Sequence, residues 1–168
     1  CGNLQKYQAP NGGFRSFETD GSDGTLEATA QASLLVSLYS LNEQISTTGV
    51  SNFLESLQNS DGGFAPVAGE PSDAKSTRNA VFSLANLGLE VTDAEATATY
   101  LRSLFDDATG LFGATSGAPG DIRSTYSVLN ALDVLNSLHT IEPLKEAVVA
   151  TLQEAASTDH FTFEGDAL

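Results

Sequence analysis

Residues 53–64 read Phe-Leu-Glu-Ser-Leu-Gln-Asn-Ser-Asp-Gly-Gly-Phe, an apolar run with helical spacing that ends in a turn-forming Asp-Gly-Gly and an aromatic residue. Related stretches occur earlier in the chain, from Leu4 to Phe14, and later, from Tyr100 to Phe112. A fourth, weaker copy begins at Val148 and lacks the Gly pair before Phe161 and Phe163. Four copies at a nearly constant spacing indicate a repeat protein.

Three threonines at equal intervals, Thr29, Thr77 and Thr125, open a second series of apolar segments. Apolar residues then recur at intervals of three and four, which favours a helix over a strand. Asp73 and Asp121 precede the last two threonines by one helical turn, where a carboxylate can accept the free N–H groups of a helix start. Each repeat is therefore predicted to contain a helix, a Gly-rich turn, a polar loop and a second helix.

The boundaries of these helices have their own signals. Residues 61–63, Asp-Gly-Gly, tolerate the positive φ at which a helix ends sharply. Residues 92–95 have the spacing of a capping box, which predicts a helix start near residue 93. Pro143 suits the first turn of the last helix, where its missing N–H costs little. One aromatic residue follows each turn and is expected to fold back between the hairpins, namely Phe14, Phe64 and Phe112.

Composition excludes several classes of protein. The 168 residues are 40% hydrophobic, which is enough for the core of one domain or two small ones. Seven basic against 22 acidic residues give a net charge of −15, which disfavours nucleic acid and anionic membranes as partners. A single cysteine excludes an internal disulfide framework and a Cys-rich metal site. No run of about 18 apolar residues is present, so no transmembrane segment is predicted.

The repeats resemble those of the prenyltransferase and squalene-oxidase repeat family, which includes protein prenyltransferase β subunits and terpene cyclases. The QW-like pattern of that family is matched by residues 53–54, Gln58, Gly62 and Phe64, with Phe in place of Trp. Residues 120–126 are also similar to the start of an inner helix in the β subunits. The resemblance implies an all-α fold, with about three and a half antiparallel helical hairpins forming a partial α/α toroid.

The hairpins divide the chain into one helical repeat domain and a C-terminal arm. The domain is predicted to cover residues 1–156, and the arm residues 157–168. Within the domain the repeats are placed near residues 1–47, 48–91, 92–139 and 140–156. A closed toroid of the family has about six hairpins, so an arc of this length is expected to leave apolar end faces that need a cover.

Family resemblance also raises the question of catalytic zinc, which the prenyltransferases hold through an Asp, a Cys and a His. This chain offers Cys1, His139 and His160, and none of them falls in the matching early turn of an inner helix, residues 73–77. Three converging ligands are needed. We therefore expect no metal site, no cofactor and no catalytic residues. The pair Asp106-Asp107 is interpreted as a helix-ending turn rather than an Asp-rich metal motif.

The family binds diphosphate through basic and Tyr side chains, and the inner helices offer four candidates. These are Lys75, Arg78, Arg123 and Tyr126, all near helix starts. In one interpretation they ring one end of the toroid and receive an anion. In the other, Lys75 and Arg123 pair with the nearby Asp73 and Asp121 or with other acidic residues of the surface, and the net negative charge repels a diphosphate.

The leading hypothesis is a non-catalytic scaffold or interaction subunit of a larger assembly with protein partners. The alternatives are a fragment of a prenyltransferase or terpene-cyclase-type enzyme, and a module that binds a lipid or isoprenoid. Cys1-Gly2 has the form left by cleavage of a lipoprotein signal, in which case Cys1 carries lipid and the protein lies outside the cytosol or in an organelle lumen. In the other interpretation Cys1 is not a processing site but only the first residue of this stretch of sequence, and the compartment is left unassigned.

Overall fold

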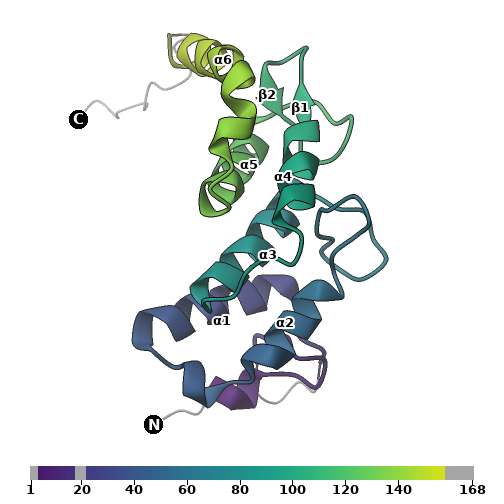
Figure 1. Cartoon of the computed structure of the whole chain (residues 1–168), viewed down its shortest axis with the longest axis vertical. Helices are drawn as coiled ribbons and strands as arrows, with labels where there is room; N and C mark the ends of the chain where they lie inside the picture. Colours follow the sequence, from purple (N-terminus) through teal and green to yellow (C-terminus); the bar gives the residue numbers. More distant parts are fainter. Residues whose placement is uncertain (1–3, 18–21, 158–168) are drawn as a thin grey trace, which may run out of the picture.

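The computed structural model describes residues 4–17 and 22–157, and it confirms the all-α class. Three helices form an inner layer, and α3 lies between α1 and α5 (Figure 1). They are α1 (Leu26–Tyr39), α3 (Ala74–Asn86) and α5 (Ile122–Val134). Three others follow them in turn along the chain, namely α2 (Thr47–Glu55), α4 (Ala94–Ser103) and α6 (Lys145–Ser157). The described part is thus a row of antiparallel helical hairpins.

Short elements join the helices. The 3₁₀ helices are η1 (Leu4–Tyr7), η2 (Asn42–Gln44) and η3 (Leu138–Leu144). A two-residue antiparallel ladder joins β1 (Phe105–Asp106) to β2 (Leu111–Phe112). No helix in the described part of the chain is both long and apolar enough to cross a bilayer.

A buried hydrogen bond to a threonine hydroxyl joins each inner helix to the turn that precedes it. The backbone N–H groups of Phe14, Phe64 and Phe112 donate to the hydroxyls of Thr29, Thr77 and Thr125 at 2.9, 3.0 and 3.0 Å. The carbonyl oxygens of the same phenylalanines accept from the residues that cap the inner helices. All three rings are fully buried, as predicted from their place after the turns. The equal spacing of the threonines therefore reflects one structural unit repeated three times.

The first glycine of each turn touches the next helix along the outer side. A Cβ on Gly12 would overlap the Gly49 carbonyl oxygen of α2, and one on Gly62 would lie 2.5 Å from the Ala96 carbonyl oxygen of α4. Both glycines have positive φ, at +92° and +86°. The side chain of Gln58 spans the same contact, donating to the Gly62 carbonyl and to the Thr97 hydroxyl at 3.3 and 3.2 Å. The Gln and Gly of the repeat thus join successive hairpins.

Helix starts agree with the predicted capping, with two corrections. Asp73 and Asp121 cap α3 and α5 as expected. Helix α4 is capped by Asp93, which accepts from the Ala96 N–H at 2.9 Å, and not by Thr92. Pro143 lies inside η3, before α6 begins at Lys145. In both cases the helix starts one or two residues after the sequence signal, a shift of the size by which helix boundaries ordinarily vary.

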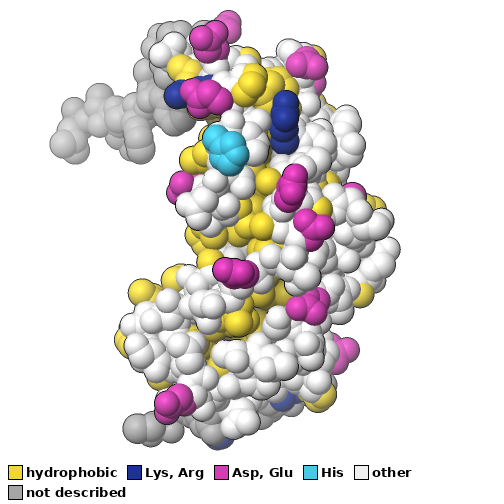
Figure 2. Space-filling view, in the orientation of Figure 1, with side chains coloured by type: hydrophobic (Ala, Val, Ile, Leu, Met, Phe, Trp, Pro, Cys, Tyr) yellow, Lys and Arg dark blue, Asp and Glu magenta, His cyan; other side chains and the backbone are white. Residues whose placement is uncertain are grey.

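The core has two parts that meet along α3. The first includes Val36 of α1, Leu54 of α2 and Leu84 of α3. The second includes Leu101 of α4 and Leu132 of α5, with Ala74 of α3. Figure 2 shows apolar side chains along the line where the helices meet, while acidic side chains are scattered over the visible face. Helix α3, which lies between α1 and α5, therefore contributes side chains to both parts of the core.

Replacing Thr77 by Val is expected to lower the free energy of unfolding by about 1–3 kcal/mol, because the buried Phe64 N–H loses its acceptor while the side chain keeps its shape. Thr77→Ser retains the hydroxyl and should lose less. Urea denaturation followed by circular dichroism measures both. Equal stability of Thr77→Val and the parent chain would contradict the role given to this hydrogen bond.

Gly62→Ala is expected to destabilise the fold more than Gly69→Ala. Both positions have a similar positive φ, but a Cβ at Gly69 meets nothing within 4 Å, whereas one at Gly62 meets the α4 backbone. Gly69→Ala should therefore cost only the left-handed backbone penalty of about 1–2 kcal/mol. The excess loss in Gly62→Ala, measured by the same denaturation, reports the close approach of turn and helix. Equal losses at the two sites would show that the contact is unimportant.

Candidate functional site

The repeat register places the four predicted site residues in two rows across the inner helices. Thr25, Asp73 and Asp121 cap α1, α3 and α5 and are equally spaced along the chain. Residues at equal distances from these caps therefore occupy equal places on neighbouring helices. The first row is Glu27, Lys75 and Arg123. The second row is Ala30, Arg78 and Tyr126.

Lys75 pairs along the first row and not with its own cap. Its Nζ lies 3.6 Å from Glu27 Oε2 on α1, and both side chains are largely exposed. The expected partner Asp73 is already engaged, because its two carboxylate oxygens accept from the N–H and hydroxyl of Ser76 at 2.8 and 2.6 Å. Of the two kinds of partner predicted for Lys75, the neighbouring Asp73 and another acidic residue of the surface, the structure has the second. An anion arriving at Lys75 would have to compete with Glu27.

Asp121 acts first as the cap of α5. Its carboxylate accepts from the Ser124 hydroxyl at 2.6 Å and from the Ser124 N–H at 2.9 Å. These bonds, led by the one from the hydroxyl, hold the pKa of Asp121 below its ordinary value. The charge of Arg123 adds a smaller effect in the same direction. Arg123 itself is exposed at the start of α5.

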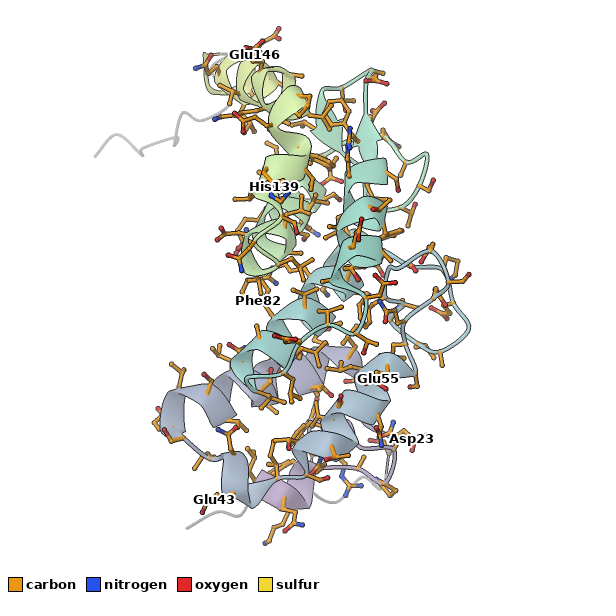
Figure 3. The ribbon with its side chains drawn as sticks, in the orientation of Figure 1. Asp23, Glu43, Glu55, Phe82, His139 and Glu146 are labelled. Carbon is orange, nitrogen blue, oxygen red and sulfur yellow. The ribbon has the colours of Figure 1, made fainter. Side chains whose placement is uncertain are left out.

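The second row brings Arg78 and Tyr126 together. The guanidinium carbon of Arg78 lies 4.7 Å from the ring centre of Phe82, labelled in Figure 3, and 5.2 Å from that of Tyr126. Its Nη1 also donates to Asn79 Oδ1 at 3.3 Å. A cation within about 6 Å of an aromatic face is attracted by the ring. Arg78 thus links α3 to α5 through packing as well as charge.

The electrostatics around this site do not concentrate positive charge. A hollow of about 350 Å³ between α1 and α3 is lined by Lys75 together with the carboxylates of Glu27 and Asp73. Two acidic groups thus face one ammonium group there. Arg78 is partly covered by its two aromatic neighbours. The arrangement suits a contact between helices better than capture of a free polyanion.

Metal-ligating side chains do not gather in the described part of the chain, where no group of three or more His, Cys, Asp or Glu residues is placed to hold an ion. His139 is exposed in η3 (Figure 3). Cys1 and His160 lie outside the described residues, as do Phe161 and Phe163 of the fourth repeat copy.

Asp106 serves the turn between β1 and β2. It accepts from the Gly120 N–H, the Thr109 hydroxyl and the Ala108 N–H at 3.1, 2.8 and 3.1 Å. These bonds, with that from Gly120 first, hold its pKa below the ordinary value for Asp. Asp107 beside it is exposed. The structure corrects the helix-ending turn predicted for this pair. Helix α4 already ends at Ser103, Asp106 lies in β1, and Asp107 begins the turn of the hairpin.

A family model described as the prenyltransferase alpha-alpha toroid domain matches residues 2–72 and 30–162. The chain belongs to the prenyltransferase α/α toroid family. The two matches overlap over residues 30–72, as expected when one repeat fits the model in more than one register.

A solved structure similar to this toroid chain is that of Candida albicans protein geranylgeranyltransferase-I complexed with GGPP. The two chains superpose with a TM-score of 0.69 at 17% sequence identity. The alignment covers 90% of this chain and 48% of the other, so the chain spans about half the length of that relative. At this identity the match shows the toroid fold alone. No curated protein sequence matches the chain.

Two residues that contact the predicted site residues, Glu27 and Phe82, were not predicted from the sequence. Glu27 could have been found, because it stands one full repeat before Lys75 and so shares its row. Phe82 offered no such signal, since its contact with Arg78 depends on side-chain direction on α3.

Asp121→Ala is expected to lower the free energy of unfolding by about 1 kcal/mol at neutral pH, whereas Asp121→Asn keeps an acceptor for the cap and should lose less. Because the folded pKa of Asp121 is lowered, its contribution is present above the unfolded pKa of about 3.9 and is lost as the pH falls through the folded pKa. The difference between the parent chain and Asp121→Ala should therefore shrink in acid. Urea unfolding at neutral and acidic pH measures this difference, and a constant value would contradict the capping role.

Proposed function

We propose that this chain is a non-catalytic helical-repeat subunit that serves as an interaction scaffold in a larger assembly. The observation that supports this most is the use of polar groups at the inner-helix starts. Asp73 and Asp121 cap helices, Lys75 pairs with Glu27, and Arg78 lies against two aromatic rings. These groups are engaged in caps and in contacts between inner helices, and the large apolar side chains exposed on this layer lie on α1 and α5.

The exposed apolar residues of the inner layer are those a scaffold would offer to a partner. On α1 they are Leu34, Leu35, Leu38 and Tyr39, and on α5 they are Ile122 and Tyr126. Clustered apolar side chains of this size on an otherwise polar protein mark interaction surfaces. The surplus of acidic residues elsewhere favours a partner that approaches through these apolar faces or carries basic groups.

A second function, the binding of an anionic isoprenoid or other lipid, is favoured by one arrangement. Arg78 and Tyr126 lie together beside Phe82 on the inner helices, so a basic group is next to aromatic surface. The similar C. albicans structure is complexed with GGPP. In this alternative the chain is a binding module, or part of an enzyme whose remaining repeats lie elsewhere.

Purification of the native protein by size exclusion, with mass spectrometry of the fractions, tests the scaffold. We expect the chain to co-elute with other protein subunits at a fixed stoichiometry that persists at raised salt, because apolar contacts are not screened. Elution as an isolated single chain would contradict the proposal.

Prenyl transfer tests the enzymatic alternative directly. The scaffold proposal expects no transfer from geranylgeranyl diphosphate to a peptide thiol, with or without added Zn²⁺. Stoichiometric zinc binding or measurable transfer would overturn it. Calorimetric titration with geranylgeranyl diphosphate tests the binding module, for which Arg78→Ala should abolish saturable binding and Arg102→Ala on α4 serves as the control.

A further inference from the structure

The inner layer ends in two faces that the described residues leave uncovered. On α1 the side chains of Leu35 and Tyr39 are exposed, and we call this face the α1 edge. On α5 the side chains of Ile122 and Tyr126 are exposed, and we call this face the α5 edge. Figure 1 shows that α1 and α5 flank α3 at opposite ends of the layer.

The repeat register shows what these faces do elsewhere in the molecule. Tyr39 is 70% exposed, whereas Leu87 at the same position of α3 is 8% exposed and belongs to the core part that includes α1. Ile122 is 55% exposed, whereas Ala74 at its position of α3 is 1% exposed and belongs to the core part that includes α5. Inside the layer both positions are buried where two inner helices meet. Each edge is therefore one half of the same helix contact.

Charge identifies the complement of the α1 edge. In the first row, Lys75 of one inner helix pairs with Glu27 of the preceding one, so basic and acidic groups at equal positions face each other. Arg123 occupies this position on α5 and is exposed. If α5 packs on an α1 in the same manner, Arg123 lies beside Glu27. The α5 edge is thus complementary to the α1 edge in charge as well as in its apolar surface.

The α1 edge is also the place where two highly acidic molecules can meet with least repulsion. Residues 28–42 carry no charged side chain, although the chain as a whole has a net charge of −15. Like charges brought together at an interface oppose association. An uncharged helix face next to one acidic group therefore favours a partner with one basic group.

We propose that two copies of the chain associate head to tail, with the α5 edge of each packed on the α1 edge of the other. Each copy spans 48% of the C. albicans toroid chain, so two copies supply about the length of one such chain. Heterologous contacts close into a ring when the rotation permits and otherwise extend into filaments. With two α5–α1 contacts, the pair closes. The inference rests on the proposed scaffold function and names its first partner as a second copy.

The mass of the purified chain in solution tests the association. Sedimentation velocity over a range of concentrations should give a species of about twice 17.5 kDa. A single chain at all concentrations would overturn the proposal, and so would a series of growing filaments. These outcomes are separate from a failure of the proposed function, which is measured on the native assembly and on prenyl transfer.

Charge reversal tests the direction of the contact. Glu27→Arg places two basic groups at each α5–α1 contact, and Arg123→Glu places two acidic groups there, so each variant alone should dimerise at least about tenfold more weakly. An equimolar mixture of the two variants restores opposite charges at both contacts and should recover the dimer. A mixture no stronger than its components would overturn the head-to-tail arrangement.

A matched pair of exposed apolar sites tests the surface itself. Tyr39→Asp on the α1 edge should abolish the dimer, whereas Val67→Asp introduces the same charge at another exposed apolar residue, in the loop before α3, and should leave it unchanged. Circular dichroism confirms that both variants keep their helices. Equal dimerisation of the two variants would overturn the role of the α1 edge.

Discussion

The bond from a phenylalanine N–H to a threonine hydroxyl, made three times in the interior, is the constraint on which the structure depends. A buried N–H without an acceptor is costly, so each turn must bring its phenylalanine to the threonine of the following inner helix. The phenylalanine carbonyl then accepts from the capping residue of that helix. Two bonds on one residue thus determine both where the inner helix begins and how it meets the turn.

Because these bonds recur once in every repeat, neighbouring inner helices begin in the same way and their side chains form rows. The Lys75–Glu27 pair and the contact of Arg78 with Tyr126 are consequences of that register. The chemistry of a row then depends on the three residues that occupy one position. A row of Glu, Lys and Arg gives one ion pair between helices, that of Lys75 with Glu27, whereas a single cluster of cations would need basic residues at all three places.

Most of the fold could be predicted from the sequence, because its determinants are local. The Asp-Gly-Gly turn, the caps at Asp73 and Asp121 and the buried phenylalanines each follow from a few adjacent residues. The partner of Lys75 could not be chosen by proximity in sequence. Asp73 is nearer along the chain, but its two carboxylate oxygens accept from Ser76, and Glu27 comes within reach of Lys75 only once α1 and α3 are aligned.

The ends of the inner layer follow the same physics as its interior. Leu87 at the end of α3 is 8% exposed and belongs to the core part that includes α1 and α2, whereas Tyr39 at the same position of α1 is 70% exposed. A repeat that buries its apolar face only against its neighbours must therefore expose that face wherever a neighbour is missing. In a chain with 22 acidic residues, apolar end faces with few charges are also where electrostatic repulsion is weakest. Composition and repetition together thus leave uncharged apolar surface on α1 in the described part of the chain.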